Sequence, residues 1–380
     1  GWTGSWIGGS GVAYPQPCTH CMASYHAWCA KNETGPTCNF RGIVMESPTL
    51  TLDATKTVTS AVIHATGLGM FALRIGAAAV TDAVLEPGFS TNFSTRVLYS
   101  TYDVTKLIVA HAAEMSAAPV RLSAAIGAGK FSLEYTSPRY ALIAELHVAY
   151  SDGTLATVLE TNAKWRVGDS AIVGENLYRG ELYDARRAME PNWRPAEALA
   201  TPPVDGVLSS MLMPPMRRME RVAAVDVARV NATSIIFDFG KNLAGYTEVK
   251  LTAGVAAGHS VALEHGELYY PATGTLVNPY LQNDAYICSG AEKAGDTWAP
   301  TFVYHGFRYV VATGLPDTCL QVKAQCLTAI FVHTDMKRTG SIHVGDGGGD
   351  DIAATGTSTR TAQILALIHK SVVQTQLSNV

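Results

Sequence analysis

The sequence predicts a mainly β protein, with two consecutive antiparallel β-sandwich domains of the jelly-roll kind followed by a C-terminal helix. Three observations predict this fold class. Runs in which Val, Ile, Thr and aromatic residues alternate with polar residues recur up to about residue 335, as half-buried strands require. Turn signals separate the runs, such as "SDG" at 151–153, where Asp-Gly tolerates the positive φ of a tight hairpin. Helical periodicity is confined to the end of the chain.

The strand-like runs fall into two groups on either side of a proline-rich stretch, "NWRPAEALATPPVDG". Proline removes ladder donors and stiffens the chain, so 196–206 is predicted to be a linker. The first sandwich is expected over 1–195, the second over 207–335, and a further linker with the helix over 336–380. The clearest strands are predicted at 57–66, 70–76, 141–161, 233–240, 246–254, 259–268 and 320–332.

The closing segment, "STRTAQILALIHKSVVQTQLSNV", is the first helix that the sequence predicts. Its apolar residues recur at helical spacing and form one stripe: Ile364, Leu365, Ile368, Val372 and Val373. A lone amphipathic helix normally packs on another element, so we expect more protein to follow this one.

Composition argues against several classes of partner. The 380 residues suffice for two or three domains, and the 47% hydrophobic content supplies sizeable cores. The formal net charge is −4 and the chain has no basic tract, which argues against nucleic acid as the main partner. No apolar run reaches the ~18–20 residues of a membrane span.

Cysteines concentrate in one predicted insertion at 18–38. The four residues there are Cys18, Cys21, Cys29 and Cys38. Two local disulfides are the favoured interpretation; a zinc site with His20 and His26 as spare ligands, or free thiols, are the alternatives. Zinc ribbons usually carry two close Cys-x-x-Cys pairs, and this stretch has one. The remaining cysteines are Cys288, Cys319 and Cys326, so at least one thiol is free or pairs with another chain.

Three Asn-x-Ser/Thr sequons make Asn32, Asn92 and Asn231 the candidates for glycosylation. Together with the cysteines they favour an oxidising compartment, so we expect a secreted or cell-surface glycoprotein. The first residues, "GWTGSWIGGSG", lack the regions of a signal peptide, so any leader is expected to have been removed.

The first motif that suggests chemistry is "YRGELYDARR" (178–187), in which Glu181 and Asp184 are three residues apart. Paired carboxyl groups suit glycoside hydrolysis, which needs an acid and a base or nucleophile on either side of the bond. Strand alternation places these two on opposite faces, so ion pairing with Arg186 is the favoured interpretation and a sugar contact is the alternative.

Two glycine-containing motifs are expected to be structural. "FDFGKNLAGY" (237–246) lacks the Lys-Ser/Thr of a phosphate loop and predicts a tight β-turn with Asn242 in the left-handed conformation. "VALEHGELYYP" offers Glu264, His265 and Glu267 as metal ligands. Alternation places Glu264 and His265 on opposite faces, which argues against a metal site from this stretch alone.

The strand-like "TFVYHGFRYVVATG" (301–314) carries a polar cluster around one glycine. We expect His305, Arg308 and Tyr309 to brace a sheet and its interface with a neighbouring domain, because Arg308 can fork onto a carboxylate. Lining a substrate cleft is the alternative. No Gly-x-Ser-x-Gly elbow or reactive cysteine context occurs, so the chain offers no convincing catalytic constellation of its own.

These phrases, taken in order, resemble the non-catalytic N-terminal half of bacterial-type α-L-rhamnosidases. Six phrases in the right order and at plausible spacing make the resemblance specific. They are "WTGSWIG" (2–8), "LEPGFSTNFSTRVLYSTYDVT" (85–105), "YSDGTLATVLETNAKWRVGDSAIVGENLYRGELYDARR" (150–187), "FDFGKNLAGY" (237–246), "EHGEL" (264–268) and "YHGFRYV" (304–310).

The resemblance implies a layout in which a jelly roll related to carbohydrate-binding modules precedes a second β-sandwich. An (α/α)6 barrel then follows in the family and carries the acidic catalytic residues. It opens with a helix like residues 358–377 and continues into an acid-rich stretch, which is expected to lie beyond Val380. The barrel is therefore expected in the remainder of the same protein or in a second chain, and no catalytic residue is assigned here.

The implied activity is inverting hydrolysis of terminal α-L-rhamnose from glycans or glycosides, with a rhamnose-containing glycan as partner. The candidates for carbohydrate binding or for lining the cleft are Glu181, Asp184, Trp193, His305 and Arg308. Sugar-binding relatives use side-chain oxygens, partly through calcium, near a loop that here carries Gly76 and Ala77 in place of Asn-Gly. Asp82 is the nearest oxygen donor, so calcium is the one cofactor under consideration and none is assigned.

Two other functions stay open. A secreted carbohydrate-binding or structural surface glycoprotein without enzyme activity would also explain the cysteines, the sequons and the altered loop. A sugar-active enzyme of the same architecture with another substrate is the third hypothesis, because fold does not fix function.

Overall fold

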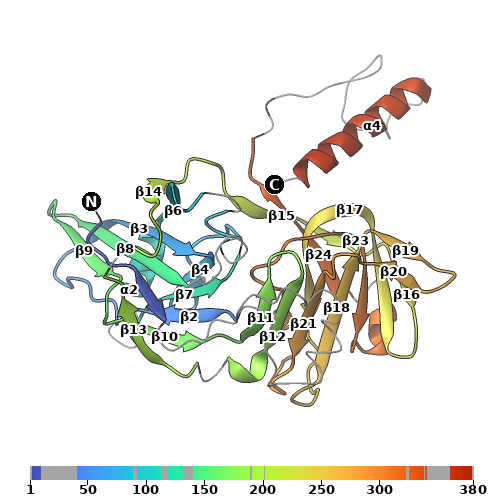
Figure 1. The fold of residues 1–380 in the computed structure, drawn as a ribbon, viewed down its shortest axis with the longest axis horizontal. Helices are drawn as coiled ribbons and strands as arrows, with labels where there is room; N and C mark the ends of the chain where they lie inside the picture. Colours follow the sequence, from blue (N-terminus) through green and yellow to red (C-terminus); the bar gives the residue numbers. More distant parts are fainter. Residues whose placement is uncertain are drawn as a thin grey trace.

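Two β-rich bodies lie side by side, and one helix projects from the second (Figure 1). The predicted fold class, two consecutive β-sandwich domains with a C-terminal helix, is confirmed. The computed structural model describes residues 2–9, 41–88, 92–112, 119–129, 131, 140–188, 191–200, 202–321, 325–337, 339 and 360–378.

The first body is one continuous sheet that curls over its own core. In sheet order its strands are β14 (Val207–Ser210), β6 (Arg96–Asp103), β3 (Val58–Leu68), β8 (Ala141–Tyr150), β1 (Ile7–Gly9), β13 (Arg194–Ala198), β10 (Arg166–Asp169), β2 (Ile43–Glu46), β7 (Leu122–Gly127), β4 (Met70–Ile75) and β5 (Ala78–Ala79), with β9 (Leu155–Glu160) paired to β8. The core includes Met45, Ile63, Ile126, Leu146 and Trp165. Burying such a side chain contributes ~1.5–3 kcal/mol, so this core holds the sheet closed.

The second body is built on a second sheet. In sheet order its strands are β11 (Ile172–Asn176), β12 (Gly180–Asp184), β21 (Asn283–Ile287), β18 (Ser260–Gly266), β23 (His305–Thr313), β17 (Ser234–Lys250), β24 (Leu327–Thr334) and β15 (Met216–Ala223); β16 (Asp226–Arg229) and β22 (Thr297–Trp298) pair with β17, and β19 (Leu268–Tyr270) pairs with β20 (Thr275–Val277). Its core includes Phe237, Phe239, Leu263, Trp298 and Phe307.

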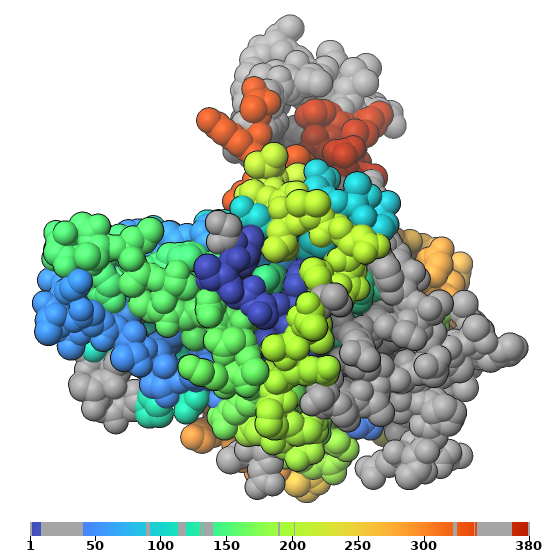
Figure 2. Space-filling model, turned by 60° about the vertical axis from the view of Figure 1, so that its left-hand side comes forward, coloured from blue at the N-terminus to red at the C-terminus, as the bar shows by residue number. Residues whose placement is uncertain are grey.

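Each sheet is completed by a segment from the other side of the predicted boundary. The hairpin β11–β12 lies within predicted domain 1–195, but β12 pairs in parallel with β21 of the second sheet. Conversely, β14 lies just past the predicted linker 196–206 and pairs in parallel with β6 of the first sheet. In Figure 2 the segment around 194–210 (yellow-green) crosses the surface beside the N-terminal segment (dark blue). Such pairings between distant segments leave no local sequence signal.

The two bodies share a third buried cluster and an ionic contact. Met70 from β4 and Met216 from β15 lie in this cluster with Tyr246, Phe302 and Ile330. Beside it, the Arg217 guanidinium forms ion pairs with the carboxylates of Asp82 and Asp335. Ile172 of β11 lies in the same cluster, so the hairpin β11–β12, which carries Glu181 and Asp184, packs against both bodies.

Local predictions have mixed outcomes. The hairpin at 151–153 is confirmed: β8 and β9 flank it, and Gly153 has a φ of 82°. The prediction of a left-handed Asn242 is wrong, because Gly240 takes the positive φ of 75° and β17 continues through the bend. The register of β17 against β23 shifts there, which absorbs the extra residues without a reversal of direction.

Helices are short or peripheral. The prediction that the C-terminal helix is the first of the chain is wrong, because α2 (Thr105–Ala112) precedes it. The carboxylate of Asp103 accepts hydrogen bonds from the N–H and the hydroxyl of Thr105 at the start of α2. The helix has 8 residues, which is too short to give a helical periodicity in the sequence. The predicted C-terminal helix is confirmed as α4 (Arg360–Leu377). The described residues also contain the 3-10 turns η1 (Ala185–Arg187) and η2 (Asp317–Leu320).

Cysteines outside the predicted insertion form one disulfide. Cys319 and Cys326 are bonded to each other, and Cys288 is free and buried. The pairing leaves one free thiol, as the odd count required. The disulfide candidates Cys18, Cys21, Cys29 and Cys38, with the sequon at Asn32, lie outside the described residues.

Candidate functional site

A cluster of buried polar side chains occupies the second sheet. The residues are His265 on β18, Asp284 on β21 and His305 on β23. These are three consecutive strands of the sheet, with β18 in the middle. All three side chains have 0% exposure. Glu264 is half-buried and His265 is fully buried, in agreement with the prediction that the two lie on opposite faces of the strand.

Hydrogen bonds connect this cluster. Nε2 of His305 lies 3.1 and 3.2 Å from the two carboxylate oxygens of Asp284. Nε2 of His265 lies 2.9 Å from the hydroxyl of Thr247, and its Nδ1 lies 3.2 Å from the carbonyl oxygen of Gln282. Burial lowers the pKa of His265 to about 3, so this ring is neutral. Burial opposes ionisation of Asp284, but His305 outweighs it and the pKa of Asp284 is lowered.

Two buried glutamates lie opposite each other on the hairpin β11–β12, and Glu181 contacts this cluster through Asp284. Glu181 accepts hydrogen bonds from the backbone N–H groups of Thr301 and Phe302, at 2.9 and 3.2 Å. Glu175 accepts one from the N–H of Ala128, which belongs to the first body. Burial raises the pKa of both carboxyl groups to about 8. Both are therefore protonated at neutral pH, and they tie the hairpin to both bodies.

Only half of the predicted ion pairing at this hairpin is confirmed. Asp184 accepts from Arg186 at 2.8 Å and contacts Arg187 at 3.4 Å, and the hydrogen bond from Arg186 lowers the pKa of Asp184. Glu181 takes no part, because it faces the interior while Asp184 faces the arginines.

Glu181 and Asp284 have the electrostatics of an acid–base pair, since one pKa is raised and the other lowered. The backbone N–H of Glu181 donates to Asp284 at 2.9 Å. Both side chains have 0% exposure, however, so the glycosidic bond of a substrate has no access to either carboxyl group. The pair stabilises the junction and does not form a hydrolytic centre.

Arg308 and Trp193 lie in separate environments. Arg308 donates two hydrogen bonds of 2.8 Å to Asp238, so the predicted fork onto a carboxylate is confirmed. The guanidinium of Arg166 lies 4.2 Å from the centre of the Trp193 ring, on the first body. The structure therefore brings together Glu181 and His305, through Asp284, and leaves the other candidates apart. Carbohydrate binding by these five residues stays a prediction.

Sequence reasoning missed Thr247, Gln282 and Asp284. Asp284 stands in "NDAYI" at a position that alternation places inside the sheet. A buried carboxylate requires a partner, so this pattern was the one available signal. The partners themselves lie on other strands and are not visible in the local sequence.

The remaining predicted features lie on the surface. Asp82, the one oxygen donor predicted near the calcium loop, is ion-paired with Arg217, and calcium binding stays a prediction. Asn92 and Asn231 are exposed. Among the described residues, neither α2 nor α4 combines the length and the apolar character of a membrane-spanning helix.

Comparison with protein families supplies two matches. Residues 56–220 match the α-L-rhamnosidase N-terminal domain, and residues 228–333 match the bacterial α-L-rhamnosidase concanavalin-like domain. The chain belongs to the α-L-rhamnosidase family. Glu181 lies in the first of these matches, and His265, Asp284 and His305 lie in the second.

Individual relatives agree with the family. An α-L-rhamnosidase of Streptomyces avermitilis is 31% identical over 273 residues, which covers 69% of this chain and 26% of the relative. One from Formosa agariphila is 27% identical over 329 residues, which covers 78% of this chain and 32% of the relative. The solved α-L-rhamnosidase of Dictyoglumus thermophilum has a TM-score of 0.78 at 24% identity, covering all of this chain and 39% of that one. The chain thus spans 26% to 39% of the length of these relatives.

Proposed function

We propose that the whole protein is an α-L-rhamnosidase that removes terminal α-L-rhamnose from glycans or glycosides. This chain supplies its non-catalytic N-terminal portion, and the catalytic acids belong to a helical domain outside these 380 residues. The relatives that carry this activity in their names support the proposal. Hydrolysis with inversion needs two carboxyl groups ~6.5–9.5 Å apart with room for a water, and the buried pair of Glu181 and Asp284 gives no such access.

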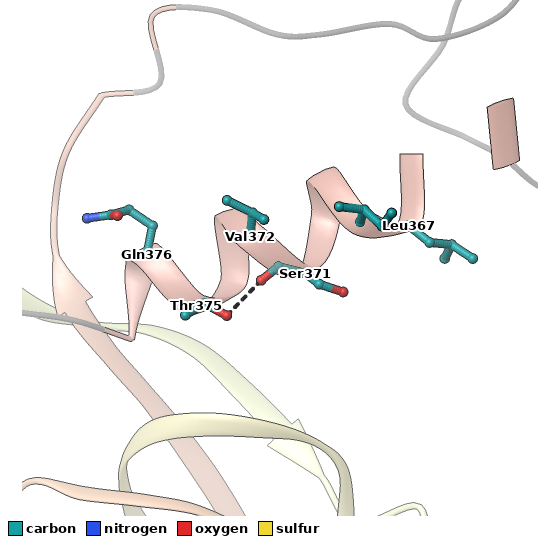
Figure 3. Close-up of a pocket in the computed structure, with 6 residues that line it drawn as sticks. Leu367, Ser371, Val372, Thr375 and Gln376 are labelled. Carbon is teal, nitrogen blue, oxygen red and sulfur yellow. Dashed lines mark hydrogen bonds between the residues drawn. The ribbon is translucent and has the colours of Figure 1, made fainter. Parts of the chain in front are cut away.

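The observation that carries the proposal is the exposed apolar face of α4. Leu367, Ile368 and Val372 are 55%, 53% and 60% exposed. They line a depression of about 460 Å³ along the helix with Ser371, Thr375 and Gln376. Figure 3 shows Val372 on the side of α4 that faces away from the strands below it. An apolar stripe of this kind is stable when another helix covers it.

The opposite side of α4 is attached to the second sandwich. The hydroxyl of Tyr304 lies 3.3 Å from the carbonyl oxygen of Ser378 and 3.4 Å from that of Val332 on β24. Gln374 donates to the carbonyl oxygen of Asn242 at 3.4 Å, and Leu377 packs against the core of the second sandwich. These contacts would orient the first helix of a helical domain on the sandwich.

Hydrolysis by the longer protein tests the proposal. The protein encoded through and beyond Val380 is assayed with nitrophenyl α-L-rhamnoside, and the anomer released first is followed by NMR. We expect release of L-rhamnose with inverted configuration. Activity on another nitrophenyl glycoside but not on the rhamnoside would assign a different substrate, and no activity on any would favour a binding or structural glycoprotein.

We also propose that the protein is secreted or displayed at the cell surface. The exposed sequons at Asn92 and Asn231 and the disulfide between Cys319 and Cys326 support this location. Production in a glycosylating eukaryotic host tests it by mass spectrometry with and without glycosidase treatment. A glycan mass that disappears in Asn231→Gln supports the proposal, and an unmodified, reduced protein contradicts it.

A further inference from the structure

We propose that His265, Asp284 and His305 form a structural site for one zinc ion within the second sandwich. The side chains of these residues, from the neighbouring strands β18, β21 and β23, bring their donor atoms together inside the sandwich. One donor atom of each lies within 4.8 Å of the donors of the other two, and all three side chains are buried. An ion held there would cross-link the sheet beside the attached hairpin β11–β12.

The donor separations fit a tetrahedral ion. Zinc binds imidazole nitrogen and carboxylate oxygen at ~2.0–2.2 Å, which separates two ligands of a tetrahedron by ~3.4 Å. Oδ2 of Asp284 lies 3.1 Å from Nε2 of His305 and 3.9 Å from Nε2 of His265. One separation is below the tetrahedral value and the other is above it, so small side-chain movements bring both to it.

The ring of His265 is oriented as in metal-binding histidines. Its Nδ1 lies 3.2 Å from the carbonyl oxygen of Gln282, and an N–H at Nδ1 donates to that oxygen. This tautomer leaves the lone pair of Nε2 directed into the cluster. Ligating histidines usually donate their second nitrogen to a carbonyl or carboxylate in this way. The hydroxyl of Thr247, 2.9 Å from Nε2, places a fourth donor atom beside the site.

The cluster is also incomplete as a set of hydrogen bonds. Glu181, whose N–H is bound to Oδ1 of Asp284, has a buried Oε1 without a hydrogen-bond partner among the described residues. Buried polar atoms without partners are rare in native proteins. Nδ1 of His305 is also buried without such a partner, so the described residues do not satisfy all the polar atoms around Asp284.

The ligand set selects the metal and its role. Two imidazole nitrogens with one carboxylate suit zinc, whereas calcium and magnesium prefer oxygen ligands alone. Catalytic zinc needs a coordination position open to substrate. Full burial closes this one, so the ion would stabilise the sheet and would take no part in hydrolysis. The inference is therefore independent of the proposed rhamnosidase activity.

Metal analysis of the full chain tests the proposal. The chain is purified without a metal-affinity step, dialysed against a chelator, and analysed by inductively coupled plasma mass spectrometry. We expect about one zinc per chain that survives dialysis in the folded state and is lost on unfolding with chelator. Folded protein that contains no zinc, and whose Tm does not rise when it is refolded with zinc, would overturn the proposal.

Variants assign the metal to this site. Asp284→Asn and His265→Gln are expected to lose the zinc, while the control His147→Gln, whose ring contacts Glu145 on the first body, retains it. Zinc that persists in the first two variants overturns the assignment.

A spectrum of the unsubstituted protein keeps the test decisive if those variants fail to fold. Cobalt substitution is expected to give the visible bands of tetrahedral nitrogen and oxygen ligation. Thiolate-to-cobalt charge-transfer bands in their place would put the metal on cysteines such as Cys18 and Cys21, and would contradict the proposal.

Discussion

The guanidinium of Arg308 on β23 donates two hydrogen bonds, each 2.8 Å long, to the carboxylate of Asp238 on the neighbouring strand β17. The fork lies at the point where the register between the two strands shifts, between Asp238 and Leu243. The hydrogen bonds from Arg308 hold the pKa of Asp238 below its ordinary value. This pair therefore stabilises the bend in β17 around Asn242, whose carbonyl oxygen accepts a hydrogen bond from Gln374 of α4.

Replacement of Arg308 tests the importance of the fork geometry. Arg308→Lys keeps the charge but loses the two parallel hydrogen bonds, and we expect a loss of about 1 kcal/mol in the free energy of unfolding. Urea denaturation measures the loss. Arg221→Lys is the matched control, since Arg221 pairs with Glu248 at a more exposed site. Equal losses of unfolding free energy in the two variants would show that the position of the Arg308–Asp238 pair at the bend of β17 adds nothing to its contribution to stability.

Stability should fall as pH rises from about 4.5 to 8 because of the buried glutamates. The folded-state pKa values of Glu175 and Glu181 are about 8, above the ordinary value of 4.5. Between these values the folded protein keeps protons that the unfolded chain releases, so the free energy of unfolding decreases as pH rises through this window. Their stabilising contribution is fully present below pH 4.5 and is lost above pH 8.

Glu181→Gln isolates this effect, because an amide oxygen can still accept from the N–H groups of Thr301 and Phe302. We expect the variant to gain stability relative to the wild type as pH rises from about 5 to 9. Denaturant midpoints measured across that range provide the comparison. A difference between the two proteins that is independent of pH would show that Glu181 is not protonated in the fold.

The attachment of α4 should depend on Tyr304. Tyr304→Phe removes the hydroxyl that lies near the carbonyl oxygens of Ser378 and Val332. We expect faster hydrogen exchange over 367–378 with little change in β24, because the core contacts of the ring are kept. Tyr280→Phe is the control, since Tyr280 is 72% exposed. Unchanged exchange in α4 would mean that other contacts hold the helix.

The disulfide between Cys319 and Cys326 closes a loop with a sequence separation of 7. A loop of this size is worth about 2 kcal/mol when cross-linked. Replacing both cysteines with alanine should lower the urea stability by that amount and make it less sensitive to reductant than that of the wild type. Cys288→Ala, at a buried free thiol, should remain sensitive to reductant. Wild-type stability that does not respond to a reductant able to break the bond would contradict this expectation.

Periodicity was sufficient to predict the fold class. Alternation predicted the strands, and it correctly placed Glu264 and His265 on opposite faces of β18. The spacing of apolar residues predicted α4, whereas α2 has 8 residues and is too short for a periodic signal. Asn242 was assigned the positive φ because asparagine tolerates it, but Gly240, two residues earlier, takes it at lower cost.

Long-range pairing is what local sequence does not encode. The hairpin β11–β12 joins the second sheet through β21, which lies about a hundred residues further along the chain. Glu181 therefore enters a buried cluster with Asp284 and His305, although its sequence neighbours favoured an ion pair with Arg186. Only the assembled sheet reveals that Asp284 links two of the predicted site residues.

The most direct test of the claim that this chain is a non-catalytic portion is an assay of hydrolysis. The isolated 380-residue chain and the longer protein are compared on nitrophenyl α-L-rhamnoside. We expect no release of nitrophenol by the folded isolated chain above the buffer rate, and turnover by the longer protein. Turnover by the isolated chain that disappears in Glu181→Gln would contradict it.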